Sequence, residues 1–166
     1  IIFIGSKDNF FYAVNSDGSL RFSIEANDDI FVSPAFLFYQ ETYFVFFGDE
    51  SGMIYAVDMA GNSLTGWPIS IGDNDYISTS VVFSDLNGDE EAEVITISGN
   101  DSKCFVYDIN GNLKEGFPLS NDSDFKSIVM NKIKITNKGL PLVAIPTTAG
   151  TGTALTWSLK LHHRLR

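Results

Sequence analysis

Oxygen-bearing side chains occupy every second position of one short acidic stretch, within the segment VVFSDLNGDEEAEVITI. The five positions are Asp85, Asn87, Asp89, Glu91 and Glu93. A hard cation such as Ca²⁺ takes about six to eight oxygen ligands in a loose shell, and a loop that alternates ligand with spacer can wrap such an ion. Gly88 permits the backbone to reverse at the centre of the stretch. The spacing predicts a Ca²⁺ site, with side-chain oxygens from four of these residues and the backbone carbonyl of Glu91.

Apolar and β-branched runs flank this loop, VVFS before it and VITI after it, which predicts two strands of a hairpin. The spacing resembles the first half of an EF-hand loop, but strands lie where an EF-hand would have helices. In this context the loop resembles the calcium loop of FG-GAP and VCBS-type β-propeller repeats, in which an acidic hairpin joins two strands of a blade. The resemblance implies a propeller fold and Ca²⁺ as the bound ion. The alternative is an acidic, solvated turn that holds no ion.

Three units of the chain repeat one pattern of turns and strands. In each, a glycine closes a strand, and a polar turn, a short alternating strand and a second turn follow. The units are Gly5–Gly18, Gly48–Gly61 and Gly99–Gly111. An aspartate followed by an apolar residue also recurs after each unit, ahead of a predicted strand. These aspartates are Asp29, Asp75 and Asp124, with spacings of 46 and 49 residues. Repeats of about 40–50 residues with four short strands each are typical of propeller blades.

The repeats predict an all-β fold, a partial β-propeller of about three and a half four-stranded blades. Residues 1–26 form an incomplete blade one, 27–72 blade two, 73–121 blade three with the calcium loop, and 122–166 an incomplete blade four. The expected strands of the two full blades are Val32–Phe38, Tyr43–Phe47, Met53–Asp58 and Leu64–Ile69, then Ile77–Ser84, Glu93–Ser98, Lys103–Ile109 and Leu113–Leu119. Complete propellers close rings of about four to eight blades, so the remainder of a longer propeller chain is an expected partner.

The last quarter of the chain allows a second interpretation. All 21 acidic residues precede Phe125, whereas seven basic residues and no acidic ones lie from Lys126 onward. Leu140–Thr153, LPLVAIPTTAGTGT, resembles the nucleotide-binding segment of iron-containing alcohol dehydrogenases. The resemblance implies an unrelated dehydrogenase-like tail and a fragment of an oxidoreductase. That family binds its metal with an Asp and several dispersed His, whereas the only histidines here are the adjacent His162 and His163.

The composition excludes several classes of function. A net charge of −10 opposes nonspecific attraction to nucleic acid. No run approaches the roughly 18 apolar residues of a membrane span, so we expect no membrane insertion. Histidine is confined to the extreme C-terminus, so no Ser-His-Asp triad can extend through the blades. The single cysteine, Cys104, is expected in the core rather than as a nucleophile.

These observations predict a noncatalytic calcium-binding β-propeller module for interaction or scaffolding, in an extracellular or cell-surface protein. Its ligand would be a protein or a glycan. Aromatic residues make up 13% of the chain, which leaves a carbohydrate-binding propeller attached to a secreted hydrolase as an alternative. The oxidoreductase fragment is the other alternative.

Overall fold

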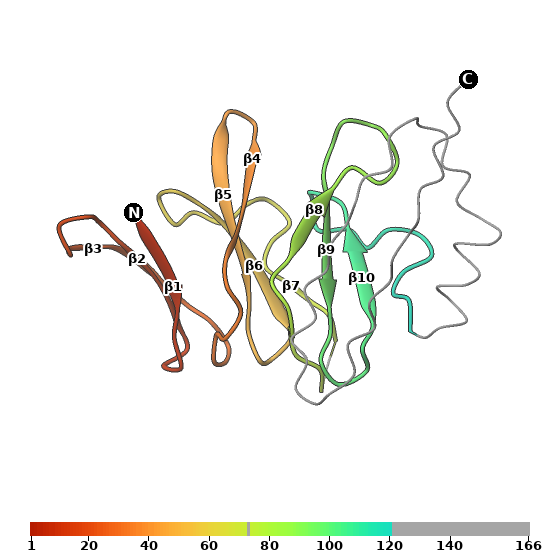
Figure 1. The fold of residues 1–166 in the computed structure, drawn as a ribbon, viewed down its shortest axis with the longest axis horizontal. Helices are drawn as coiled ribbons and strands as arrows, with labels where there is room; N and C mark the ends of the chain where they lie inside the picture. Colours follow the sequence, from red (N-terminus) through yellow and green to blue (C-terminus); the bar gives the residue numbers. More distant parts are fainter. Residues whose placement is uncertain (73, 121–166) are drawn as a thin grey trace, which may run out of the picture.

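The computed structural model describes residues 1–72 and 74–120, which form antiparallel β-sheets joined by turns (Figure 1). The strands are β1 (Ile2–Gly5), β2 (Phe10–Val14), β3 (Leu20–Glu25), β4 (Ala35–Tyr39), β5 (Thr42–Gly48), β6 (Met53–Asp58), β7 (Ile69–Ser70), β8 (Val82–Ser84), β9 (Glu93–Ile97) and β10 (Cys104–Tyr107). These two ranges contain no helix, and the predicted all-β class is confirmed.

The strands form three sheets that follow one another along the chain and stand side by side (Figure 1). The first has the order β1-β2-β3, the second β4-β5-β6-β7, and the third β8-β9-β10. Within each sheet every strand pairs with its neighbours in sequence, which is the arrangement of strands in a propeller blade. We therefore call the three sheets blade one, blade two and blade three.

The turn after β6 has the same hydrogen bonds as the turn after β10. In blade two, Asp58 accepts from the backbone amide and the side-chain amide of Asn62, both at 2.9 Å. In blade three, Asp108 accepts from the same two groups of Asn112, at 2.8 and 2.9 Å. An Asp side chain that binds the amides just after it stabilises a chain reversal. The repeat in the sequence is thus a repeat of local structure.

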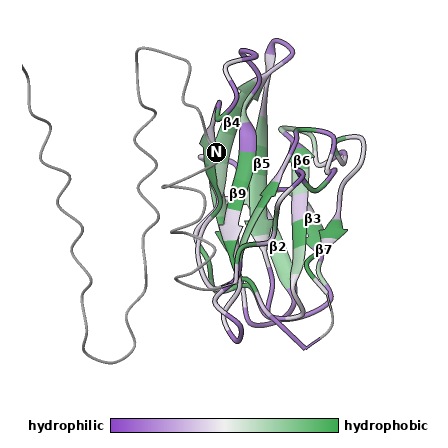
Figure 2. Ribbon diagram, turned by 90° about the vertical axis from the view of Figure 1, so that its right-hand side faces the viewer, coloured by the Kyte–Doolittle hydropathy of each residue, from purple (hydrophilic) through white to green (hydrophobic). Residues whose placement is uncertain are grey.

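The hydrophobic core lies between the faces of neighbouring blades. Phe11 of blade one stacks on Phe47 of blade two with ring centroids 3.9 Å apart. On the other face of β5, the Phe46 ring meets Phe83 of blade three edge-on at 5.0 Å. Successive strand residues point to opposite faces, so Phe46 and Phe47 supply one ring to each interface. The apolar colouring follows the strands, while the loops carry most of the polar colouring (Figure 2).

The outer turn of blade two contacts blade three through Trp67. Its ring is 6% exposed, and its indole Nε1 donates a hydrogen bond to the Ile109 carbonyl at 2.9 Å. The backbones also approach closely, since a Cβ on Gly66 would lie 1.9 Å from the Asn110 carbonyl oxygen. Gly66 also has a positive φ of 89°, so both its conformation and its surroundings require glycine.

The predicted outer strands are too long. The ranges concerned are Leu64–Ile69 in blade two, of which β7 retains only its last residue, and Leu113–Leu119 in blade three. The second range pairs with β10 only through isolated bridges at its two ends. Turns at Thr65–Gly66 and at Glu115–Gly116 interrupt the ladder, and the following Pro68 and Pro118 have no amide hydrogen to donate.

The predicted inner strand of blade three, Ile77–Ser84, is also too long. Strand β8 keeps only Val82–Ser84, and Ile77 forms a single bridge with Ser98. Polar residues Ser78, Thr79 and Ser80 fill the gap between them. The segment between Ile77 and Val82 is therefore irregular, and the regular strand begins only at β8.

The predicted fourth blade, residues 122–166, and the dehydrogenase-like segment 140–153 lie outside the described residues. Within the described ranges, no helix is long and apolar enough to cross a bilayer.

We expect this protein to lose stability steeply in alkaline solution. Burial raises the pKa of Tyr55 and of Tyr107 to about 12, and that of the Cys104 thiol to about 11. The unfolded chain releases these protons at lower pH than the folded chain does. The associated stability is therefore complete below about pH 9 and is lost as the pH rises towards 12. Urea midpoints measured across this pH range should fall as the pH rises. The double variant Tyr55→Phe, Tyr107→Phe should show a smaller fall. An equal pH dependence of the midpoint in the natural chain and the double variant would contradict the assignment of the loss to these tyrosines.

Candidate functional site

The predicted calcium loop is the exposed hairpin that joins β8 to β9. Its first residue, Asp85, organises the turn, because one carboxylate oxygen accepts from the Gly88 amide at 2.6 Å and the other from the Glu90 amide at 3.1 Å. Gly88 has a positive φ of 82°, as the sequence analysis requires for a reversal at this point.

Asn87 and Asp89 lie next to each other in the same turn. The Asn87 side-chain amide donates to Asp89 Oδ2 at 2.7 Å, and Asn87 Oδ1 accepts from the Asp89 backbone amide at 2.9 Å. Asp89 Oδ1 in turn accepts from the Glu91 amide at 2.9 Å. The Glu91 amide and the Asn87 side chain hold the pKa of Asp89 below its usual value, with a further contribution from the Lys114 charge. Asp89 is therefore an anion at neutral pH.

Glu93 differs from the other four predicted ligands because it is buried, with 2% of its surface exposed. One carboxylate oxygen accepts from the Leu86 amide at 2.7 Å, and the other lies 2.8 Å from the Lys114 ammonium group. Glu93 raises the pKa of Lys114, so this lysine stays charged. Both oxygens of Glu93 thus have partners within the protein.

The five predicted positions therefore divide into two groups. Asp85, Asn87 and Asp89 share one turn and remain at least partly accessible, and Glu91 is exposed beside them. Glu93 points into the blade, towards Lys114. In the described ranges, no three acidic, His or Cys side chains come together as a ready metal-binding group. The turn thus brings Asp85, Asn87 and Asp89 together, with their side-chain oxygens hydrogen-bonded within the turn, whereas Glu93 is paired with Lys114.

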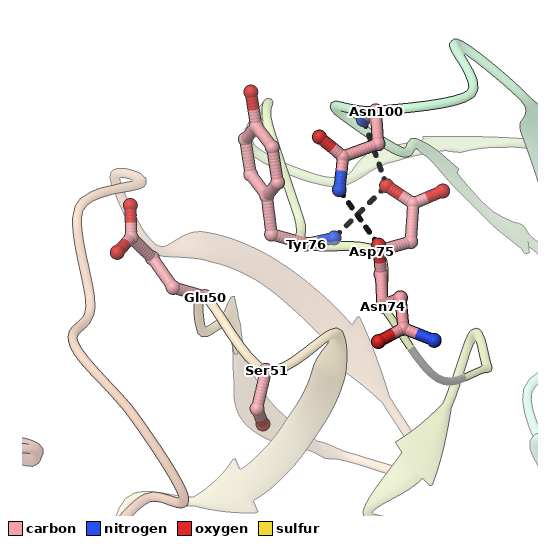
Figure 3. Close-up of a pocket in the computed structure, with 6 residues that line it drawn as sticks. All are labelled: Glu50, Ser51, Asn74, Asp75, Tyr76 and Asn100. Atoms are coloured by element: carbon pink, nitrogen blue, oxygen red, sulfur yellow. Dashed lines mark hydrogen bonds between the residues drawn. The ribbon is translucent and has the colours of Figure 1, made fainter.

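A second candidate site, which the sequence analysis did not identify, is a groove between blades two and three. One part is a hollow of about 650 Å³ lined by Glu50, Ser51, Asn74, Asp75, Tyr76 and Asn100 (Figure 3). A second hollow of about 470 Å³ shares Glu50 and Tyr76 with the first. It is lined further by residues 31–33, Asp49 and residues 77–80. We call the two hollows together the inter-blade groove.

One wall of the groove is fixed by Asp75. A single oxygen of its carboxylate accepts from the amides of Tyr76 and Asn100, each at 2.9 Å. Burial by itself would raise the pKa of Asp75, but hydrogen bonds from the Ser98 hydroxyl and these amides outweigh it and lower the pKa. Asp75 is therefore ionised at neutral pH. The Tyr76 ring stands over Gly99, where a Cβ would come within 1.9 Å of its Cζ atom.

The floor of the groove contains a saturated carboxylate and an unsatisfied hydroxyl. Asp49, 1% exposed, accepts from Tyr55 Oη and the Asn27 amide on one oxygen, and from the Ser51 and Met53 amides on the other. Thr79 is 5% exposed, and its Oγ1 has no hydrogen-bond partner among residues 1–72 and 74–120. Buried hydroxyl groups are almost always paired, and among the described residues Thr96 Oγ1 is the other buried side-chain oxygen without a partner.

The rim of the groove carries an exposed aromatic ring. Phe31 is 52% exposed, and the Lys7 ammonium lies 4.6 Å from its ring centroid. A cation thus already rests on an aromatic face at the edge of the groove.

The single cysteine lies in the core of blade three. Cys104 is buried, and its raised pKa keeps it protonated at neutral pH, in agreement with its predicted place in the core. The groove and the hairpin offer carboxylates, amides, hydroxyls and aromatic rings, all of which suit binding.

Three antiparallel sheets with strands in chain order, packed face to face, define a β-propeller. Comparison with solved structures agrees. The crystal structure of BamB from Moraxella catarrhalis, a β-propeller, matches with a TM-score of 0.52 and 18% sequence identity, over 72% of this chain and 32% of that chain. This chain thus spans about a third of the length of that structure.

No protein-family model matches the chain, and no curated protein does so either. The fold class is confirmed, whereas membership of the FG-GAP and VCBS repeats stays a prediction.

Proposed function

We propose that this chain is a noncatalytic, calcium-binding part of a β-propeller that serves interaction or scaffolding in an extracellular or cell-surface protein. The observation that carries the proposal is the β8–β9 hairpin, in which hydrogen bonds to backbone amides gather the side-chain oxygens of Asp85, Asn87 and Asp89 in one turn. Carboxylate and amide oxygens are the ligands that Ca²⁺ prefers in proteins. Asp85, Asn87, Asp89 and Glu93 would hold the ion with the Glu91 carbonyl, and the bound ion would neutralise the crowded acidic turn.

Lys114 pairs with Glu93 in the structure. Its ammonium group compensates the buried charge of Glu93, the last of the predicted ligands. A divalent cation at the loop supplies the same compensation with greater charge. The loop can therefore remain folded without calcium, and an ion that binds Glu93 would replace Lys114 as the compensating charge.

An exposed apolar face supports the proposal that further blades belong to the propeller. On the side of blade one away from blade two, Ile2 is 60% exposed, Ile4 53% and Leu20 59%. The opposite face of the same sheet packs against blade two through Phe11, which is fully buried. Blades in a ring cover one another on both faces, so the remainder of a longer propeller chain would bury these side chains.

The two alternative functions depend on different parts of the chain. The oxidoreductase fragment depends on residues 140–153, which lie outside the described ranges. Carbohydrate binding would use the aromatic rings that line the inter-blade groove, Tyr76 and Phe31.

Thermal unfolding tests the calcium proposal. A ligand that binds only the folded state adds about 2.7 kcal/mol when its concentration is about a hundredfold above its Kd. We expect a higher Tm in calcium than in EDTA for the natural chain. The double variant Asp85→Ala, Asp89→Ala should melt at one temperature in both solutions. Identical melting of the natural chain with and without calcium would refute the proposal.

A further inference from the structure

We propose that the inter-blade groove binds a basic segment of a partner polypeptide, with a lysine or arginine side chain between Glu50 and Tyr76. This inference rests on the proposed interaction function but not on the calcium site. A β-propeller fold by itself does not determine the binding site or the ligand, and the groove supplies both.

The charge of the groove selects a cationic ligand. Glu50 and Asp75 both line the first hollow, and neither has an ion-pair partner among residues 1–72 and 74–120. Glu50 is exposed, so a partner can reach it without any change in the fold. The basic residue nearest the rim, Lys7, lies over the Phe31 ring. Lys103 lies close enough to Asp75 to interact with its charge, so Glu50 carries the negative charge that remains for a ligand to neutralise.

The shape of the first hollow suits a long side chain with a charged end. Figure 3 shows Glu50 on one side and Tyr76, Asp75 and Asn100 on the other, with the Glu50 and Tyr76 side chains rising in the same direction. An ammonium or guanidinium group placed between them can pair with the carboxylate and rest against the aromatic ring. The methylene stem of lysine or arginine can cover apolar surface along the wall.

The second hollow suits the backbone of an extended chain. Thr79 lines it, and its unpaired Oγ1 is both a donor and an acceptor. A passing peptide carries one N–H and one C=O per residue, so it can supply the missing partner. An unsatisfied buried hydroxyl costs stability in the free protein, and a ligand that pairs with it recovers that cost on binding.

A saccharide fits these observations less well. Neutral sugars need polar groups with free hydrogen-bonding capacity around an aromatic face. The groove's Asp49 and Asp75 carboxylates instead accept from the protein's own amides, and Asn100 donates to the Asn74 carbonyl. Among the described residues, the charge of Glu50 is the property of the groove that remains without an ion-pair partner. The chain's overall charge of −10 also steers basic partners towards it.

The experiment measures fluorescence anisotropy of a labelled short peptide that alternates lysine and serine, with the full chain as the receptor. A second peptide with glutamate in place of lysine serves as the ligand control. Glu50→Lys should weaken binding of the basic peptide by at least about fivefold, since it removes an attraction and adds a repulsion. Glu115→Lys makes the same change of charge on an exposed turn outside the groove, and should weaken it by less than about twofold.

Thr79→Val separates a ligand-binding role from a structural one. The substitution keeps the side chain's shape and removes the unpaired hydroxyl, so the Tm should stay the same or rise. Binding of the basic peptide should nevertheless weaken by about two- to fivefold, because one hydrogen bond is lost. If Thr79 had a purely structural role, the substitution would not weaken peptide binding while leaving the Tm unchanged or higher.

Three results would overturn the proposal. The first is equal weakening by Glu50→Lys and Glu115→Lys, which indicates nonspecific attraction to an acidic surface. The second is the absence of binding by the basic peptide. The third is displacement of the peptide by neutral oligosaccharide with unchanged affinity in Glu50→Lys, which assigns the groove to a glycan. Anisotropy is recorded in calcium and in EDTA, so a failed calcium site and a failed groove give different patterns.

Discussion

Replacement of Trp67 by alanine should lower the free energy of unfolding by about 3–5 kcal/mol, the range for removal of a large buried aromatic side chain. The ring is 6% exposed, and Phe46 and Tyr107 pack against it edge-on, at 5.1 and 6.3 Å. The substitution also leaves the Ile109 carbonyl without its indole donor. Because Trp67 joins blade two to blade three, this variant loosens the contact between blades.

Phe117 provides the matched control, because it follows the outer turn of blade three at the same point of the repeat. It is only half-buried and packs beside Leu119 within blade three. Phe117→Ala should therefore cost clearly less than Trp67→Ala in urea unfolding. An equal loss of free energy of unfolding in the two variants would contradict a special contribution of Trp67 to the contact between blades.

Replacement of Lys114 by methionine should destabilise the protein by about 3 kcal/mol in EDTA. The variant keeps most of the stem but leaves the Glu93 carboxylate, 2% exposed, without its cation. Breaking a buried ion pair usually costs about 3–5 kcal/mol, and the lower end applies because the Lys114 side chain is 32% exposed. If calcium binds the loop, it supplies the missing charge, and most of the loss should disappear in its presence.

Lys103→Met is the control for this variant, since Lys103 also pairs with a carboxylate in blade three. Its partner, Asp101, is 58% exposed, so solvent screens the pair and its loss should change the free energy of unfolding little, with or without calcium. A large loss for Lys114→Met that calcium leaves unchanged would mean that Glu93 is not a ligand of the ion.

The sequence predicted the blades because their signals are local. Glycines, Asp-Gly turns and alternating apolar residues act within a few positions, and the hydrogen bonds of Asp58 and Asp108 repeat as the sequence repeats. The outer strands were predicted too long for the same reason. Apolar residues at Leu64 and Leu113 continue the alternating pattern, but a turn after each of them ends the ladder.

Contacts between distant residues could not be predicted in this way. The pairing of Glu93 with Lys114 joins a hairpin to the outer turn of the same blade, and depends on the register of the strands between them. The inter-blade groove combines segments around Glu50, Tyr76 and Asn100. The one available signal was the repeated aspartate, which identified Asp75 as an aligned residue but not as part of a wall.

Isothermal titration of the metal-free chain with calcium chloride tests the central claim most directly. We predict a saturable uptake of one ion per chain that disappears in the Asp85→Ala, Asp89→Ala variant, whereas Glu115→Lys leaves it unchanged. A calcium site in the β8–β9 hairpin would be contradicted if the natural chain gave no heat of binding. It would also be contradicted if the double variant bound calcium as the natural chain does.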